Sequence, residues 1–275
     1  MADAPKLAPP ENEEDELAGS EMPLLDHLIE LRQRLIYSLV TVGVLCVVCF
    51  IFARQIFDFL LGPFRAAVPS VSDVHLIYTA PQEYFFTELS VALFAAVFLA
   101  FPMIASQIYM FVAPGLYKRE RKAFVPYLVA TPIFFLLGAA LVYFIVAPMA
   151  LHFFLSMQET DPNGISITMQ TRVSEYLSFI MTLILAFGVC FQLPVILTLL
   201  ARIGIVGSTF LKKGRKYAVV VFLIISALLA PPDPFSQVGL TLPLYLLYEV
   251  SIQSVAWVER QRAAKEAAEK AALGL

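Results

Sequence analysis

The sequence predicts an all-α, polytopic membrane protein with six transmembrane helices, bent by prolines into a concave bundle, and with both termini on the cytoplasmic side. Of the 275 residues, 59% are hydrophobic and only 15% are charged, whereas soluble domains usually carry about 25% charged residues. The apolar residues form uninterrupted blocks, and a block of about 18 residues or more spans a bilayer core as a helix. Lysine and arginine are also distributed unevenly between successive loops.

The apolar blocks predict the positions of the spans. We expect them at residues 35–53, 89–112, 123–151, 176–201, 217–230 and 235–258. The fifth block holds only 14 residues before a proline-rich turn at 231–234, and the sixth holds 14 before Glu249. A single block of this length could be re-entrant. Because the two flank a helix-stopping proline turn, a short transmembrane hairpin is the better interpretation.

The basic residues predict the orientation, since cytoplasmic loops are rich in lysine and arginine. With the N-terminus inside, six spans place 16 of the 19 basic residues in inside segments, and only Arg54, Arg65 and Arg172 outside. A four-span chain would leave the proline turn and its apolar flanks without a place. Two long outer loops are expected, at 54–88 and 152–175.

Two tails flank the predicted membrane domain of residues 27–258. Residues 1–26 form an acidic cytoplasmic tail, unlike a secretory signal or a transit peptide, both of which avoid acidic residues. Residues 259–275 form a cytoplasmic tail whose Ala, Glu, Lys and Arg content favours a helix. The missing transit peptide and the charge bias indicate a bacterial inner membrane.

Prolines interrupt most of the predicted spans. Each one removes a backbone hydrogen bond, and kinked spans need neighbouring helices or water to satisfy the freed carbonyl groups. Repeated kinks favour a curved bundle that encloses a concave surface. The residues concerned are Pro102, Pro126, Pro132, Pro148, Pro194 and Pro243.

The residues that usually carry catalysis or metal binding are scattered. His27, His75 and His152 form no His-Glu-x-x-His pair, and neither a Gly-x-Ser-x-Gly elbow nor a phosphate-binding glycine loop occurs. The three cysteines lie inside apolar blocks and are best interpreted as small core residues. We therefore expect no catalytic residue, metal, cofactor or nucleic-acid partner, and not an enzyme.

Two carboxylates at the expected inner face are candidate binding groups. Glu30 precedes the first span, and Glu120 lies among four basic residues at 118–122. Glu120 could simply neutralise its neighbours. It could instead pair with an arginine that a partner supplies. Spacing alone does not decide between these interpretations.

Three polar residues in or near the spans are further candidates. Gln192 lies in the middle of the fourth span beside Pro194, where it could form a helix–helix hydrogen bond or serve a functional role. Glu249 is costly inside a membrane and is therefore a candidate site residue. Asp233 is first of all a candidate turn or cap residue.

Five ordered strings of the sequence resemble the TatC family, the receptor subunit of the twin-arginine protein translocase. They begin at His27 (HLIELRQRL), Phe111 (FVAPGLYKRER), Tyr176 (YLSF), Ala186 (AFGVCFQLP) and Pro231 (PPDPFSQ). The resemblance extends from residue 27 to about residue 257. It implies the export of folded proteins whose signal peptides carry paired arginines.

The resemblance also implies roles for particular residues. Glu120 and Glu30 match the carboxylates that receive the arginine pair, and Phe111 matches an aromatic of the same recognition surface. Arg32, in the same string as Glu30, is a further expected signal-peptide-binding residue. The implied partners are the signal peptides, the lipid bilayer and single-span subunits of the TatA/TatB type, with a possible homo-oligomer inside the complex. Gln237 matches a polar position of the partner dock.

Two positions depart from the pattern of the family. Ala230 stands where some members carry a hydroxyl residue, and Gln192 stands where many carry a glutamate. An alternative function is a secondary transporter of a small solute or ion, with Glu249 and Gln192 as a midplane site. A membrane-embedded hydrolase has less support, because no nucleophile–base pair is visible.

Overall fold

A computed structural model describes residues 24–67, 76–112, 118–158, 170–229 and 234–272, and in these ranges the regular elements are all helices. This confirms the all-α prediction. In chain order the elements are α2 (Leu24–Ile51), α3 (Ala53–Leu60), α4 (Gly62–Ala67), α5 (Glu83–Val112), α6 (Lys118–Leu141), the π-helical turn η2 (Val142–Val146), α7 (Ala147–Ser156), α8 (Val173–Cys190), α9 (Leu193–Arg202), α10 (Ser208–Leu229) and α11 (Pro234–Ala272).

Five helical segments are long and apolar enough to cross a membrane. They are His27–Ile51, Glu83–Phe111, Pro126–Ser156, Val173–Arg202 and Gln237–Lys265, and they contain most of the predicted spans one, two, three, four and six. The predicted fifth span corresponds to α10. That helix has 22 residues, or about 33 Å at 1.5 Å per residue, but four basic residues occupy its first half. The six-span count and the orientation therefore stay predictions.

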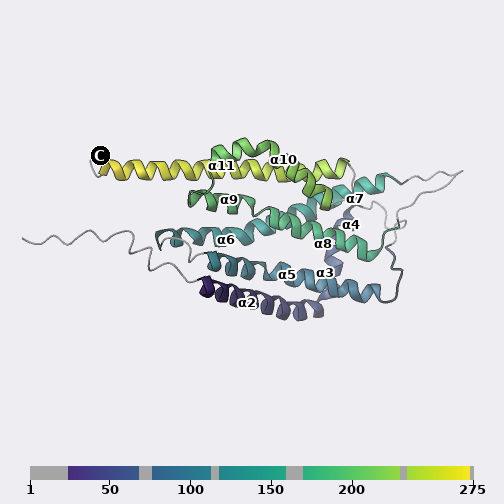
Figure 1. Cartoon of the computed structure of the whole chain (residues 1–275). Helices are drawn as coiled ribbons and strands as arrows, with labels where there is room; N and C mark the ends of the chain where they lie inside the picture. Colours follow the sequence, from purple (N-terminus) through teal and green to yellow (C-terminus); the bar gives the residue numbers. More distant parts are fainter. Residues whose placement is uncertain (1–23, 68–75, 113–117, 159–169, 230–233, 273–275) are drawn as a thin grey trace, which may run out of the picture.

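The helices lie roughly along one direction, and α10 runs back along α11 (Figure 1). The start of α2, the end of α5, the start of α6 and the C-terminal half of α11 lie at the same end of this bundle. The end of α9 and the start of α10 lie at this end too, and we call it the basic end. Eleven described basic side chains belong to its segments: Arg32, Arg34, Arg202, Lys212, Lys213, Arg215, Lys216, Arg260, Arg262, Lys265 and Lys270.

The prolines coincide with irregular helix geometry at two places. The turn η2 leads into α7, whose second residue is Pro148, and the missing N–H of Pro148 would otherwise bond to a carbonyl of that turn. Helix α8 ends at Cys190, and α9 restarts at Leu193 with Pro194 in its first turn. The prolines at 102, 126, 132 and 243 lie inside continuous helices.

The segment predicted as the first outer loop is partly helical. It contains α3 and α4, and α5 begins at Glu83, earlier than the predicted span. The helices form because apolar residues recur at helical spacing: Leu60 and Phe64 are both buried, and α4 packs against α7. A hydropathy window centred on membrane-length blocks does not detect such short helices.

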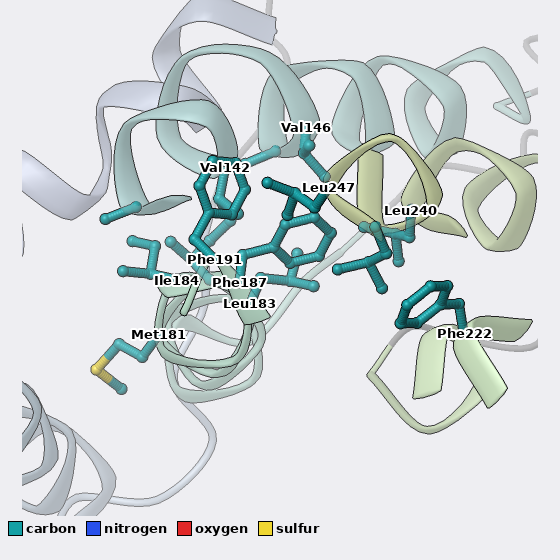
Figure 2. Close-up of a cluster of buried hydrophobic side chains, with 14 of the residues drawn as sticks. Val142, Val146, Met181, Leu183, Ile184, Phe187, Phe191, Phe222, Leu240 and Leu247 are labelled. Carbon is teal, nitrogen blue, oxygen red and sulfur yellow. The ribbon is translucent and has the colours of Figure 1, made fainter. Parts of the chain in front are cut away.

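The main apolar core joins α7, η2, α8, α10 and α11 (Figure 2). Phe187 and Leu183 of α8 are fully buried at its centre, between Val142 and Leu240. A second cluster of small residues joins α2 to α5, with Ala92 and Ala96 fully buried. Small residues are typical of membrane helix interfaces because they let the backbones approach closely.

Candidate functional site

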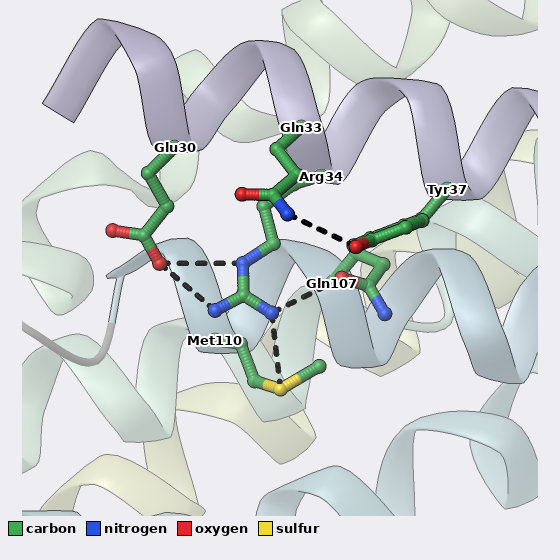
Figure 3. Close-up of polar contacts among 6 residues, drawn as sticks. All are labelled: Glu30, Gln33, Arg34, Tyr37, Gln107 and Met110. Atoms are coloured by element: carbon green, nitrogen blue, oxygen red, sulfur yellow. Dashed lines mark hydrogen bonds and ion pairs between the residues drawn. The ribbon is translucent and has the colours of Figure 1, made fainter. Parts of the chain in front are cut away.

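The polar site at the basic end is built from α2 and α5. Arg34 donates two hydrogen bonds to Glu30 Oε1, from Nη2 at 2.8 Å and from Nε at 3.2 Å. Its Nη1 donates to Gln107 Oε1 at 3.2 Å and contacts Met110 Sδ at 3.3 Å (Figure 3). Arg34 therefore bridges the two helices, and Glu30 helps to hold it.

Glu30 is largely buried despite its position near a helix end. Its side chain is 17% exposed, and its Oε2 is buried without a hydrogen-bond partner among the described residues. A buried carboxylate oxygen without a partner costs free energy, so this oxygen favours any cationic donor that reaches it. Glu30 thus already binds one guanidinium group, that of Arg34, through its Oε1, while its Oε2 remains without a partner among the described residues.

The other residues predicted for this site, Phe111, Arg32 and Glu120, differ in how they lie relative to Glu30. Phe111, near the end of α5, stacks on His27 of α2, with ring centroids 4.2 Å apart. Arg32 is exposed, and the contacts of Glu30 and Arg34 with other described residues do not include it. Glu120 lies in the first turn of α6. Its side chain falls outside the described part of the chain, so its relation to Glu30 stays a prediction.

Gln192 is buried at the break between α8 and α9. Its Nε2 donates to the backbone carbonyl of Thr131 at 2.9 Å, and it is 6% exposed. Thr131 is in turn bonded to the hydroxyl of Tyr109 at 2.9 Å. Of the two interpretations of Gln192, the structure shows the helix–helix hydrogen bond, which joins the third predicted span to the fourth.

Gln237 joins α10 and α11. Its Nε2 donates to the Leu223 carbonyl at 3.2 Å. One turn further along, the hydroxyls of Ser226 and Thr241 are hydrogen-bonded at 2.9 Å, and Ser226 is fully buried. Asp233, in the turn between these helices, lies outside the described residues. The polar positions of this hairpin therefore hold its two helices together.

Glu249 is already paired. Arg215 Nη2 donates to its Oε2 at 2.8 Å, and the Tyr245 hydroxyl donates to its Oε1 at 2.9 Å. The pair joins α10 to α11 and neutralises the carboxylate. The structure does not bring Glu249 together with Gln192, whose amide bonds to α6.

Sequence reasoning missed several residues that make these contacts. The spacing of Glu30 and Arg34 at i, i+4 is a local signal that could have identified this ion pair. Glu259, placed in the predicted tail, accepts hydrogen bonds from the Ser208 backbone N–H at 2.9 Å and from its hydroxyl, at the start of α10. No local pattern indicates this contact, because the two residues lie 51 positions apart.

The fold and the site define a multi-pass α-helical membrane protein with a largely buried carboxylate–arginine pair at one end of its bundle. A family model described as Sec-independent protein translocase protein (TatC) matches residues 26–243. The TatC protein of Magnetococcus marinus is 43% identical over 249 residues, which cover 90% of this chain and 89% of that protein. The TatC protein of Escherichia coli K12 is 38% identical over 230 residues, covering 84% and 86%. The chain belongs to the TatC family.

A solved structure supports the same assignment. The crystal structure of a twin-arginine translocase receptor, TatC, aligns with a TM-score of 0.74 at 36% identity, and the match covers 85% of this chain and 99% of that one. The family is a component of a Sec-independent protein translocase, which is a transport protein and not an enzyme. As such a component, the chain belongs to a complex with other subunits, in a membrane that it crosses several times.

Proposed function

We propose that this chain is the receptor subunit of a twin-arginine translocation system. In this proposal it binds Arg-Arg signal peptides through Glu30 and Glu120 at the basic end, which faces the cytoplasm of a bacterium from the inner membrane. The observation that supports it best is the geometry at Glu30. This carboxylate already holds one guanidinium group, and its second oxygen is buried without a partner among the described residues.

The identity of the incoming cation follows from the same geometry. Arg34 reaches Glu30 with two nitrogens of one planar group, and a lysine ammonium cannot reproduce that fork. A paired-arginine peptide would either add a second guanidinium at Oε2 or replace Arg34. Both routes favour Arg-Arg over Lys-Lys.

The test measures binding of an Arg-Arg or a Lys-Lys signal peptide to the full chain in membranes. A photoreactive residue at Lys118 would detect adducts. We expect Arg-Arg adducts that fall at least tenfold in Glu30→Gln and in Glu120→Gln, with weak Lys-Lys labelling throughout. Glu175→Gln is the matched control, because Glu175 is an exposed carboxylate of α8, far from the start of α2. Equal labelling by both peptides would contradict the proposal.

We also propose that the α10–α11 hairpin holds single-span partner subunits of the TatA/TatB type. Tyr217, Val221, Ile224 and Leu228 form an exposed apolar stripe along α10. Because Gln237 donates to the carbonyl of Leu223, it would support this dock by fixing the register of the hairpin. Among the described residues no contact favours the transporter alternative, since Glu249 is paired with Arg215 and Gln192 is bonded to α6 instead.

A further inference from the structure

We propose that a cleft between α6, α9, α10 and α11 is a binding site for an anionic phospholipid, with the phosphate at Lys212 and Arg260 and the acyl chains along the apolar walls. The cleft has a volume of about 900 Å³. It lies on the opposite side of α6 in the fold from the α2–α5 pair that carries Glu30. The inference therefore goes beyond the proposed signal-peptide site.

The charges of the cleft favour an anion. Three cations line it, namely Lys212, Arg215 and Arg260, together with a single carboxylate among the described residues, Glu249. Arg215 and Glu249 neutralise each other through their 2.8 Å ion pair. Neither Lys212 nor Arg260 forms an ion pair with a carboxylate in the part of the chain that the structure describes. Two uncompensated positive charges remain.

The remaining walls of the cleft favour hydrocarbon. Phe134 of α6, Val195 of α9 and Ile252 of α11 line its interior, and the last two are 4% and 2% exposed. Trp257, at 61% exposure, lines the same cleft, and tryptophan is enriched at the level of lipid headgroups. The cleft therefore combines cationic and apolar lining residues, which matches an amphiphile and not a small hydrophilic ion.

The size and position of the cleft point to a lipid. A volume of about 900 Å³ is near the upper limit of drug-sized ligand pockets, which hold roughly 300–1,000 Å³, and a lone phosphate would leave most of it empty. Helices α6, α9 and α11 all belong to membrane-length apolar segments, so the surrounding lipids are the most abundant amphiphiles available. Basic pockets between transmembrane helices bind anionic headgroups in this way.

The test uses the full chain purified in detergent and native mass spectrometry after addition of phosphatidylglycerol or phosphatidylcholine. We expect retained phosphatidylglycerol, weak retention of phosphatidylcholine, and at least tenfold less phosphatidylglycerol bound to the double variant Lys212→Gln/Arg260→Gln. The matched control is Lys213→Gln/Arg202→Gln, which also removes two positive charges, one from α10 and one from α9, at positions that do not line the cleft. The control should retain the lipid within twofold of the parent chain.

Three outcomes would overturn the proposal. Equal loss in both double variants would show attraction by overall charge and not by the cleft. If inorganic phosphate protected the chain against thermal unfolding as well as phosphatidylglycerol does, the ligand would be a soluble anion. If the variant Lys212→Gln/Arg260→Gln lost Arg-Arg signal-peptide crosslinking but retained phosphatidylglycerol like the parent chain, the cleft would be a peptide site and not a lipid site. Thermal unfolding of each variant without lipid, within a few degrees of the parent chain, confirms that the variants fold.

Discussion

The ion pair between Glu30 and Arg34 shows how one side chain serves two purposes at the residue scale. Arg34 fixes α2 against α5 through Gln107, and it also occupies the carboxylate proposed to receive a signal peptide. The side chains of Arg34 and Glu30 are 26% and 17% exposed. Removal of the arginine alone would therefore leave a largely buried charge without its partner, which costs more than an exposed pair is worth.

We predict that Arg34→Gln lowers the thermal stability of the chain and that the double variant Glu30→Gln/Arg34→Gln recovers part of the loss. A double-mutant cycle of unfolding in detergent should give a favourable coupling on the order of 1 kcal/mol between the two side chains. The cycle of Glu175 with Arg172, an exposed pair at 3.8 Å, is the control and should give a coupling near zero. Strictly additive effects at Glu30 and Arg34 would show that the ion pair does not form.

Gln192 joins two helices through a buried amide that carries no charge. Its amide nitrogen donates to a carbonyl of α6, while its Oε1 is buried without a partner among the described residues. A glutamate at this position, as the family resemblance suggests for many members, would offer no N–H to the Thr131 carbonyl when ionised. This chain therefore uses the position to join two helices, and it does so without a charge.

At the scale of elements, close contact between α6 and α8 depends on two glycines. A Cβ at Gly138 would lie 2.8 Å from the Phe187 carbonyl oxygen, and one at Gly188 would lie 2.5 Å from the Phe135 ring. Both distances are shorter than non-bonded heavy atoms tolerate, so an added Cβ would strain the contact between α6 and α8. A closely packed interior transmits such strain to its neighbours. The helices approach each other here because neither position carries a side chain.

We predict that Gly138→Ala destabilises the chain by about 1–3 kcal/mol, the usual cost of overpacking. The backbone carbonyl that it meets cannot move without displacing α8. Gly43→Ala is the matched control, because a Cβ there meets nothing within 4 Å, and alanine favours a helix over glycine by up to about 1 kcal/mol. Thermal unfolding in detergent measures both variants. A Gly138 variant as stable as the Gly43 variant would contradict the packing of α6 on α8.

The elements also show what the sequence could and could not predict. Hydropathy located the long helices, because a membrane span is a local property of the chain. The proline signal at Pro194 marked the break between α8 and α9. The contacts of Arg34 with Gln107 and of Ser226 with Thr241 join residues on different helices, and no local pattern encodes such pairs. Glu120 stays a prediction, since its side chain lies outside the described residues.

At the scale of the whole molecule, the two ends of the bundle differ in construction. At the end where α5 and α8 begin, Glu83 accepts hydrogen bonds from the Ser174 hydroxyl at 2.5 Å and from the Thr79 backbone N–H at 2.8 Å. A backbone bridge between Ile77 and Arg172 ties the same segments together. The basic end instead holds the cleft and the carboxylate with an unused oxygen. At the end where α5 and α8 begin, polar side chains are paired with one another, whereas the basic end has a cleft and a carboxylate oxygen without a partner among the described residues.

The number of spans decides which side of the membrane each end faces. Five helical segments are long and apolar enough to cross a membrane, and α10, which is long enough but carries four basic residues, is not among them. Two observations favour its crossing nonetheless. Helix α10 starts beside Glu259 of α11 at the basic end and runs antiparallel to α11, and its 22 residues reach about 33 Å. The four basic residues of its first half could then lie at the interface, where Lys216 already contacts the Tyr217 ring at 5.0 Å.

We therefore predict that both termini lie on the same, cytoplasmic side. Green fluorescent protein joined after Leu275 should fluoresce, and alkaline phosphatase at the same position should be inactive, because the phosphatase works only outside the cytoplasm. Reporters inserted at Gly164, between the third and fourth spans, are the control and should show the opposite pattern. If α10 does not cross, a cytoplasmic N-terminus requires an external C-terminus, and the phosphatase after Leu275 would be active. That result would place the C-terminal half of α11, together with Arg260 and the proposed lipid cleft, on the external side of the membrane, opposite the side on which Glu30 is proposed to bind a signal peptide.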